Sequence, residues 1–414
     1  MLPGMSFRSG PPKATGMDLA CTRPHAGPAR VPHDHESQDH EFKEADLNAT
    51  RVCERIGGFE RRGATTAAMS AEPTLATAAP LIAVTGAAGF LGGALVLRLL
   101  EEGFKVRALV RRGQSPAMDL KRVETRSPSN GEGLELVHGD LENRQALMQV
   151  VDGAEVVIHV AGMFRTEGPR TKFFEVNQAG TERMLRVARA AGARRFVHCS
   201  TIGVHGDVHD GPADEQSPFN PCDAYQESKL KAEEACAKAM EQGDMEVVIV
   251  RPCSIYGPGD LRMLKLFRML LRRRFLMVTA GAPNFHPVYI DDLVRAFVSA
   301  ASVAEAAGET FIVGGPRFLP LEEYITLAAA AVDAPRPRWR VPYPLMELAA
   351  RACEGVCVPL RLEPPLHRRR LSFFKHNRAF NTDKARRVLR YEPRIDVEEG
   401  FRRTVEWYRS QRLL

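Results

Sequence analysis

Two side chains with a chemical use stand four residues apart, Tyr225 and Lys229. If Tyr225–Met240 is a helix, both lie on one face, and Asp223 stands where an N-cap residue belongs. A phenol has an ordinary pKa of about 10, and a nearby ammonium group favours its phenolate form. The pair can therefore exchange a proton with a substrate hydroxyl or carbonyl while hydride leaves or reaches the same carbon.

Two neighbouring hydroxyl side chains, Ser200 and Thr201, follow from a predicted strand, Arg195–Ser200. A hydroxyl at the carboxyl end of a strand can hydrogen-bond to the reacting oxygen and stabilise its developing negative charge. The other hydroxyl would cap the following loop. These residue types alone do not decide which of the two is catalytic.

A glycine-rich turn, Gly86–Gly92, stands between a predicted strand, Leu81–Thr85, and a predicted helix, Gly93–Glu102. Glycines in this context permit a tight turn, a close approach of backbone N–H groups to phosphates, and close packing of helix on strand. The stretch predicts a pyrophosphate site for a dinucleotide cofactor. The turn residues assigned to cofactor binding are Gly86, Ala88, Gly89, Phe90, Leu91 and Gly92.

Strands and helices alternate along this part of the chain. The predicted strands are Leu81–Thr85, Val106–Val110, Leu134–Val137, Val156–Val160, Arg195–Ser200 and Glu246–Val250, the last running into Arg251-Pro252. The predicted helices between them are Gly93–Glu102, Phe173–Ala191 and Tyr225–Met240. This alternation predicts a parallel sheet covered on both faces, with ligands at the carboxyl ends of its strands. The predicted fold is α/β, a Rossmann-type doubly wound parallel sheet with a smaller C-terminal substrate lobe.

The chain divides into three predicted regions. Residues 1–78 are rich in Pro, Gly, Arg and His without a sustained period, so we expect a disordered N-terminal extension, and Met69 is an alternative start of the chain. Residues 79–255 form the predicted NAD(P)-binding domain. Residues 256–414 form mainly the substrate lobe, with some elements returning to the sheet.

Composition narrows the function classes. The chain has 414 residues, a formal net charge of +6 and eight cysteines without a C-x-x-C pair. The modest, dispersed charge lacks the aromatic and basic stripe of a nucleic-acid surface, and the cysteine usage favours a reducing, cytoplasmic location. We expect no metal site, and interpret the tract His33-Asp34-His35 with His40 as a solvated tail.

The sequence does not predict a membrane span, because no apolar run reaches the roughly 20 residues that cross a bilayer. It does not predict a secretory leader either, because no apolar region follows a charged start. Leu345–Leu360 is apolar but carries three charged residues. We interpret it as a packed helix, and the alternative is a segment at a membrane surface.

The order and spacing of these motifs resemble an extended short-chain dehydrogenase/reductase of the NAD-dependent epimerase/dehydratase family, over about residues 80–410. The likeness extends to the branch of 3β-hydroxysteroid dehydrogenases and dihydroflavonol-reductase-like enzymes. The motifs that carry it are the glycine turn, Gly139-Asp140-Leu141, His159-Val160-Ala161-Gly162, Val176-Asn177 with Gly180-Thr181, Ser200-Thr201, Tyr225-x-x-x-Lys229, Arg251-Pro252, Tyr256-Gly257-Pro258-Gly259 and Val288-Tyr289-Ile290-Asp291-Asp292. In the carboxyl third, Pro364-Pro365-Leu366, Phe380–Ala385 and Tyr391-Glu392-Pro393 add to the likeness to that branch.

The resemblance implies a role for each matching residue. Tyr225 would be the acid/base, and Lys229 would orient the cofactor ribose and lower the tyrosine pKa. Counting back from Val204-His205-Gly206, where relatives often have Val-Tyr-Gly, puts the catalytic hydroxyl at Thr201, with Ser200 as the alternative. The cofactor would also contact Asp140 and Leu141 at its adenine, and Ala161, Gly162 and Pro252 along its length.

The end of the second predicted strand bears on the choice of cofactor. NAD-specific sites usually place an acidic residue there for the ribose 2′-hydroxyl, whereas this chain has Arg111-Arg112 after Val110. Arginine suits a 2′-phosphate by charge and geometry. The expected cofactor is NADP or NAD, with a preference for NADP through Arg111.

Three functions remain open at this point, and the first two are enzymes that differ in their substrate class. One is a secondary alcohol or ketone on a bulky apolar ring. Another is a nucleotide sugar, for which the basic predicted helix Leu261–Leu271 with Lys265, Arg268 and Arg272 could hold a diphosphate. The third function is a non-catalytic dinucleotide-binding regulator, which the retained Tyr225 and Lys229 disfavour. Peripheral membrane contact and a homodimer are left open.

Overall fold

The computed structural model describes residues 80–111, 113, 133–164, 169–209, 211–279, 283–357, 366, 371 and 374–414. The predicted extension at residues 1–78, the histidine tract within it, Arg112 and Pro364-Pro365 lie outside the described residues.

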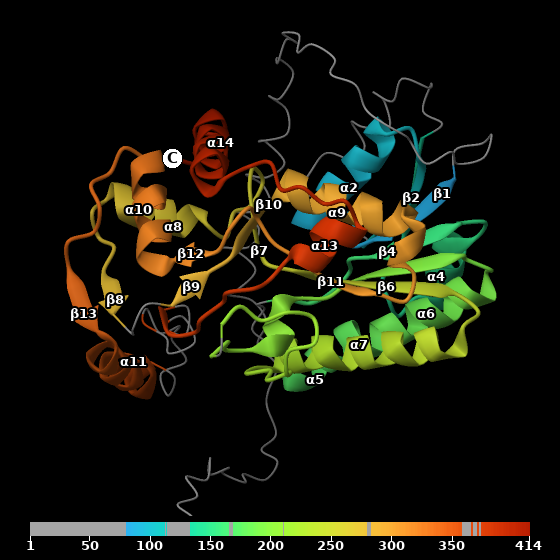
Figure 1. The fold of residues 1–414 in the computed structure, drawn as a ribbon, viewed down its shortest axis with the longest axis horizontal. Coiled ribbons are helices and arrows are strands. Elements are labelled where there is room, and N and C mark those ends of the chain that lie inside the picture. Colours follow the sequence, from blue (N-terminus) through green and yellow to red (C-terminus); the bar gives the residue numbers. More distant parts are fainter. Residues whose placement is uncertain are drawn as a thin grey trace, which may run out of the picture. The chain divides into compact units, whose positions relative to one another are not determined.

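The central sheet has seven parallel strands in the order β11-β6-β5-β4-β1-β2-β3 (Figure 1). All six predicted strands belong to it. The bounds of the seven strands are β1 (Leu81–Thr85), β2 (Lys105–Val110), β3 (Leu134–His138), β4 (Val156–His159), β5 (Arg195–Cys199), β6 (Glu246–Pro252) and β11 (Thr310–Val313), the last of which is not among the six predicted. The chain runs outward from β1 to β3 and then returns beside β1 at β4. This reversal of strand order is where doubly wound sheets bind ligands, beyond the carboxyl ends of the strands.

Helices cover both faces of the sheet, as the alternating pattern predicts (Figure 1). One face carries α2 (Phe90–Glu101) and α9 (Ile290–Ser302), and the other carries α4 (Arg144–Val151), α6 (Gly180–Ala190) and α7 (Ala224–Gln242). Successive strand residues point to opposite faces, so Ile82 and Val84 join the core under α2 while Ala83 joins the core under α4 and α6. Both faces are therefore apolar, and the sheet is a rigid support for whatever stands at its strand ends.

The predicted helix Phe173–Ala191 is not a single α-helix. It consists of α5 (Arg170–Phe173), a π-helical turn η1 (Phe174–Ala179) and α6. The π turn carries Asn177, which is buried and bonds Met163 and Ser228. These bonds offset the loss of regular geometry, and π turns of this kind recur at functional sites.

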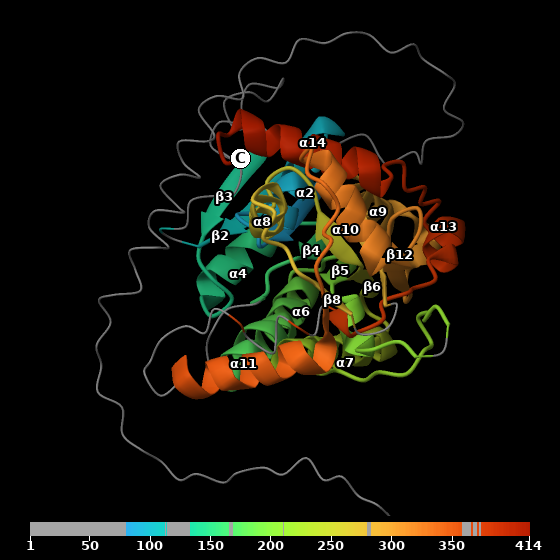
Figure 2. The ribbon, with the colours of Figure 1, turned by 90° about the vertical axis from the view of Figure 1, so that its left-hand side faces the viewer.

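The second lobe is built from short strand pairs and helices after β6. The strand pairs are β7 (Ser254–Tyr256) with β10 (Pro287–Tyr289), β9 (Asn284–Phe285) with β12 (Leu319–Pro320), and β8 (Met277–Thr279) with β13 (Arg340–Pro342). The helices are α8 (Leu264–Leu271), α10 (Leu321–Ala331), α13 (Asp383–Val388) and α14 (Val397–Ser410). Edge-to-face aromatic contacts join α8, α10 and α14 around Phe401, as Figure 2 shows for the helix positions. Helix α8 begins three residues later than the predicted Leu261.

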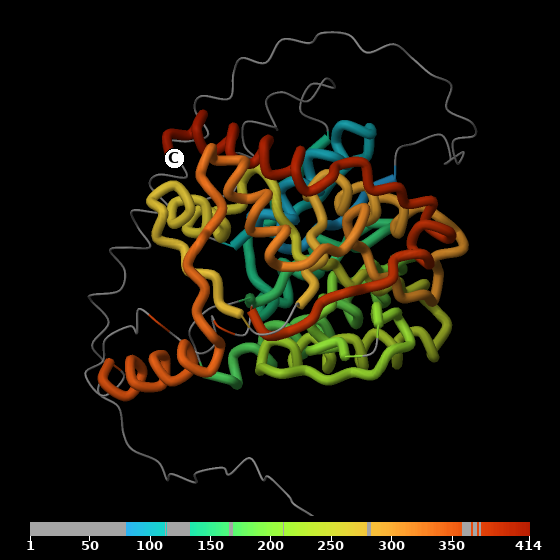
Figure 3. The backbone as a smooth tube through the Cα atoms, turned by 60° about the vertical axis from the view of Figure 1, so that its left-hand side comes forward, coloured from blue at the N-terminus to red at the C-terminus, as the bar shows by residue number. Residues whose placement is uncertain are grey.

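The apolar segment predicted at Leu345–Leu360 overlaps α11 (Tyr343–Cys357), which the chain reaches from α10 through β13 at the edge of the lobe (Figure 3). Its Ala350 is buried against Val278. Leu345, Leu348 and Val356 remain exposed, so the packed-helix interpretation holds for one face of α11 only. Within the described residues, no helix combines the length and the apolar character that crossing a bilayer requires.

Candidate active site

The glycine turn after β1 is shaped by close backbone contacts. Gly86 has a φ of +72°, and a Cβ there would lie 2.7 Å from the backbone nitrogen of Ala161. A Cβ on Gly92 would lie 2.1 Å from the carbonyl oxygen of Gly86. Both positions therefore require glycine, since the turn packs directly on the segment after β4 and on its own helix.

The N-terminus of α2 offers unsatisfied donors. Its N-cap residue, Gly89, makes no side-chain cap hydrogen bond, and the first turn, Phe90–Gly92, contains no acidic residue. The backbone N–H groups of that turn and the positive end of the helix dipole are thus available to an anion. These residues fit the pyrophosphate of a dinucleotide cofactor.

A chain of buried hydrogen bonds supports the turn from below. The His159 ring bridges Thr85 Oγ1 at 2.8 Å and Thr181 Oγ1 at 3.1 Å, and the Ala161 N–H donates to Thr85 Oγ1 at 3.2 Å. Burial lowers the pKa of His159 to about 3, so the ring is neutral at physiological pH. Ala161 and Gly162 therefore stand on a fixed, uncharged support beside the glycine turn.

Helix α7 carries Tyr225 and Lys229, and it begins as predicted with Asp223 accepting the N–H of Gln226 at 2.9 Å. Lys229 is 4% exposed, and its Nζ donates to the Cys199 carbonyl at 2.6 Å and lies 3.3 Å from His198 Nε2. An ammonium group has three N–H donors, so one remains for a further acceptor. Burial lowers the pKa of Lys229.

Tyr225 is half-buried at the edge of the Phe164 ring, with the ring centroids 4.9 Å apart. The Thr201 side chain stands near its phenol. Burial raises the pKa of Tyr225, and the hydrogen bond from Thr201 and the charge of Arg262 offset that only in part. The prediction that Lys229 lowers the pKa of Tyr225 is therefore wrong for the protein by itself, because burial raises this pKa by more than neighbouring positive charge lowers it.

The two candidate hydroxyls have different surroundings. Ser200 is 4% exposed and its Oγ donates to the buried carboxylate of Glu233. Thr201 is more exposed, accepts the N–H of Gly203 at 3.1 Å and contacts Tyr225. The structure thus brings Thr201 to the tyrosine and turns Ser200 away from it.

A buried ion pair beneath this site escaped the sequence reasoning. Arg251 Nη2 lies 2.6 Å from Glu233 Oε2, with the side chains 4% and 5% exposed. Arg251 Nη1 also lies 3.1 Å from His205 Nε2, so His205, which replaces the tyrosine of relatives, faces the interior. The available signals were the four-residue spacing from Lys229 to Glu233 and the Arg251-Pro252 motif.

The remaining residues assigned to the cofactor lie at the neighbouring strand ends. Arg111 is exposed directly after β2, and Pro252 is buried at the end of β6. Asp140 is exposed, and its Oδ1 accepts the N–H groups of Glu142 and Asn143 at 2.9 Å and 3.0 Å. Leu141 is buried beneath it. The side chain of Asp140 thus closes the turn after β3.

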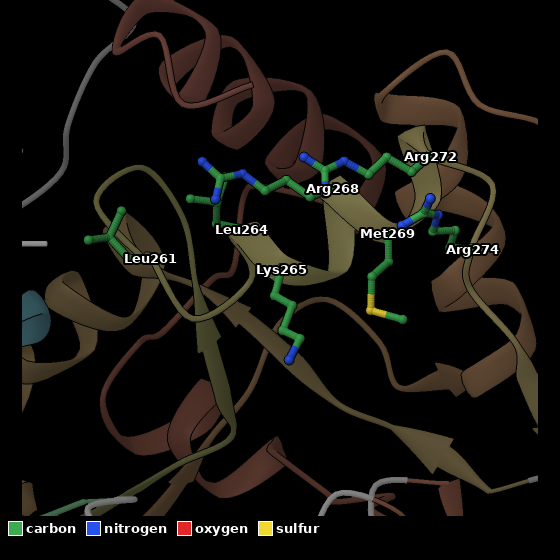
Figure 4. Close-up of a pocket in the computed structure, with 7 residues that line it drawn as sticks. All are labelled: Leu261, Leu264, Lys265, Arg268, Met269, Arg272 and Arg274. Carbon is green, nitrogen blue, oxygen red and sulfur yellow. The ribbon is translucent and has the colours of Figure 1, made fainter. Parts of the chain in front are cut away.

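A separate pocket of about 450 Å³ lies along α8 (Figure 4). It is lined by Leu261, Leu264, Lys265, Arg268, Met269, Arg272 and Arg274. The three basic residues singled out for a sugar diphosphate do come together here. Arg268 is engaged, since its Nη2 donates to the Leu413 carbonyl at 2.9 Å, and neither Tyr225 nor Thr201 lines the pocket.

Metal ligands do not gather in the described part of the chain, where no group of three or more His, Cys, Asp or Glu residues could hold an ion.

Known proteins resemble this chain over most of its length. Residues 82–314 match the family model described as the NAD dependent epimerase/dehydratase family. The chain is 29% identical over 334 residues to 2-alkyl-3-oxoalkanoate reductase of Stenotrophomonas maltophilia, covering 78% of this chain and 97% of the relative. It is 30% identical over 347 residues to sterol demethylase protein B of Methylococcus capsulatus, covering 80% of this chain and 99% of the relative.

Among solved structures, the model is similar to DesIV, a dTDP-glucose 4,6-dehydratase from Streptomyces venezuelae, with NAD and TYD bound. The TM-score is 0.64 at 25% identity, and the match covers 80% of this chain and 98% of that one.

Proposed function

Since the chain belongs to the NAD-dependent epimerase/dehydratase family of extended short-chain dehydrogenases/reductases, we propose that it is an NAD(P)-dependent oxidoreductase acting on a secondary alcohol or ketone. The observation that carries this proposal is the grouping of Thr201, Tyr225 and Lys229 at the carboxyl end of β5, where Lys229 Nζ donates to the carbonyl of Cys199, the last residue of that strand. In the sheet order β5-β4-β1, all strands run parallel, so the glycine turn after β1 lies at the same edge, with only β4 between.

The division of work among the residues follows from their surroundings. When bound, the nicotinamide cofactor supplies or accepts the hydride. Tyr225 donates its phenolic proton to the carbonyl oxygen during reduction and accepts it back during oxidation. Thr201 hydrogen-bonds to the same oxygen and stabilises the negative charge that develops there. The remaining N–H of Lys229 would hold a ribose hydroxyl of the cofactor.

The amides at the start of α2 would hold the pyrophosphate, with Gly86 and Gly92 allowing the backbone to reach it. Asp140 and Leu141 would stand at the adenine, and Ala161, Gly162 and Pro252 along the dinucleotide. For the ribose phosphate, Arg111 supports a preference for NADP(H), because no acidic residue follows β2 at that point. Relatives of known structure such as DesIV hold NAD, so turnover with both cofactors is the test of this preference.

Two relatives with reductase or sterol names support a choice of substrate class, and the match covers 97% and 99% of their length. We favour a ketone or secondary alcohol on a largely apolar molecule. A nucleotide-sugar epimerase or dehydratase is the alternative, and the likeness to DesIV supports it. The basic pocket on α8 offers it little, because that pocket does not include the tyrosine or the threonine.

One experiment separates these functions. Purified full-length protein is incubated with sterols, flavonoid-like ketones and nucleotide sugars, and the absorbance of reduced cofactor is followed. A reductase consumes NAD(P)H stoichiometrically with a ketone and exchanges cofactor freely. An epimerase converts sugars without net consumption and retains its dinucleotide through purification. A non-catalytic regulator turns over none of them, which would overturn the proposal.

A further inference from the structure

The loop between β7 and α8, residues 257–263, packs on the glycine turn. Gly259 has a φ of +94°, and a Cβ there would lie 3.4 Å from Cδ2 of Phe90, the first residue of α2. The substrate lobe therefore places this loop beside the predicted pyrophosphate site. The residue that it presents there is Arg262.

Arg262 is held in one orientation by its own loop. Its Nε donates to Asp260 Oδ1 at 2.7 Å, and its Nη2 donates to Asp260 Oδ2 at 2.9 Å and to the Ile255 carbonyl at 3.0 Å. Asp260 is 2% exposed, so the carboxylate is a fixed anchor. These bonds use the donors of Nε and Nη2, while Nη1, with two N–H groups, has no partner within the described residues.

The guanidinium lies near two aromatic rings, one at the start of α2 and one in contact with Tyr225. Its Cζ is 5.6 Å from the ring centroid of Phe90 and 5.6 Å from that of Phe164. Phe164 in turn meets the edge of Tyr225 at 4.9 Å between centroids. Phe164 therefore lies near both the Arg262 guanidinium and the acid/base tyrosine, and the side chain of Arg262 is 40% exposed.

We propose that Nη1 of Arg262 binds a carboxylate of the substrate close to the reacting carbon, so that the enzyme prefers 3-oxo or 3-hydroxy carboxylic acids to their neutral analogues. This inference rests on the proposed oxidoreductase function and narrows its substrate class. In a 3-oxo acid the carboxylate stands one carbon away from the carbonyl, which suits a cation that lies near the same Phe164 ring as the tyrosine.

A carboxylate suits this site better than a phosphate. Asp260 already neutralises Arg262, so the pair adds no net charge, which favours a singly charged ligand over a dianion. The Phe90 and Phe164 rings lie near the guanidinium and reduce its contact with water, which strengthens a charge-assisted hydrogen bond. The pyrophosphate has its own donors at the start of α2, which leaves Nη1 for the substrate.

The test compares matched acid and ester substrates. The probes are 2-oxocyclohexane-1-carboxylate with its ethyl ester and 3-oxooctanoate with its methyl ester, each reduced by the full-length protein with NADPH and with NADH. We expect kcat/KM for the acids to exceed that for the esters by roughly 10- to 100-fold, as for one hydrogen bond to a charged group. In Arg262→Gln this ratio should fall to near one, with ester turnover within about threefold of the parent protein.

Two further variants complete the design. Arg262→Lys keeps the positive charge and should restore part of the acid preference, and Arg268→Gln removes a neighbouring arginine of α8 and should leave it unchanged. The acid-to-ester ratio of the parent protein needs no variant, so poor folding of Arg262→Gln cannot hide a failure.

Each other result has one meaning. Ketone turnover without acid preference would overturn the carboxylate site and leave the oxidoreductase function standing. A rise in the Kd of NADPH in Arg262→Gln, with the acid preference unchanged, would assign Nη1 to the cofactor instead. Turnover of neither acids nor esters, and of no ketone in the wider panel, would overturn the proposed function itself.

Discussion

The sheet side and the lobe side of the candidate site are built in different ways. On the sheet side, Gly86, Thr201 and Tyr225 follow directly from strand ends and from one helix start, so short motifs predict their positions. On the lobe side, Arg262 is placed by the contact of Gly259 with Phe90 and by the anchor Asp260, which no short motif predicts. We infer that the sheet side performs the chemistry and the lobe side selects the substrate, and the predictions below test that division.

The largest effect is expected from Tyr225→Phe. This substitution removes the proton donor and keeps the ring against Phe164, so kcat should fall by roughly 10³ while the melting temperature and cofactor affinity stay unchanged. Steady-state kinetics measure the change in kcat, and dinucleotide titration measures the cofactor affinity. Tyr343→Phe, on α11 in the lobe, is the matched control and should keep full activity. Retained turnover in Tyr225→Phe would refute the assignment of the acid/base.

The glycine turn is tested with two alanine variants. Gly86→Ala and Gly103→Ala both place alanine at a positive φ, +72° and +86°, but only Gly86 has backbone atoms within reach of a new Cβ. Both should lose on the order of 1 kcal/mol of stability from the φ angle. Gly86→Ala alone should lose roughly 10² or more in affinity for the dinucleotide, measured by titration. Equal affinity in the two variants would mean that the turn does not hold the cofactor.

The two hydroxyls provide a test within the sheet side. Thr201→Ala should slow kcat by roughly 10², because a donor to the reacting oxygen is lost. Ser200→Ala should act on stability instead, by about 1–3 kcal/mol, since the buried Glu233 loses a hydrogen-bond donor. Thermal unfolding and kinetics of both variants measure this. The opposite pattern would make Ser200 the catalytic hydroxyl.

The loss of folding stability at acid pH can be compared between a buried histidine of the sheet and one of the lobe. Burial lowers the pKa of His159 in the sheet to about 3 and that of His286 in the lobe to about 4. The unfolded chain takes up these protons near pH 6.5 and the folded chain does not, so stability is full above pH 6.5 and falls as the pH drops. At pH 5 each ring should account for about 2 kcal/mol. Unfolding curves at pH 7 and pH 5 measure the loss, and His159→Gln should reduce it; an unchanged loss would exclude His159 as a cause.

The smallest effect concerns the choice between cofactors. Arg111→Ala should lower kcat/KM with NADPH by about tenfold relative to NADH, as expected for one exposed charge on a phosphate. The ratio of the two rates is the readout, and Arg98→Ala on α2 is the control. A strong preference of the parent protein for NADH would contradict the role of Arg111.

Sequence reasoning reached the sheet side almost completely and the lobe side poorly. The six strands of the core, the glycine turn and the start of α7 at Asp223 depend on local periodicity and capping, which the sequence displays directly. The Glu233 and Arg251 pair, the inward-facing His205 and the position of Arg262 depend on contacts between distant segments. The pKa of Tyr225 was misjudged for the same reason, because its direction is set by burial and not by the neighbouring Lys229.

The measurement that tests the central claim most directly is equilibrium binding of NADPH and NADH to the purified full-length chain, followed by quenching of protein fluorescence or by calorimetry. We expect saturable binding of at least one dinucleotide with one site per chain. The affinity should be higher for NADPH than for NADH, and it should fall strongly in Gly86→Ala. A folded protein with no measurable affinity for either dinucleotide would contradict it.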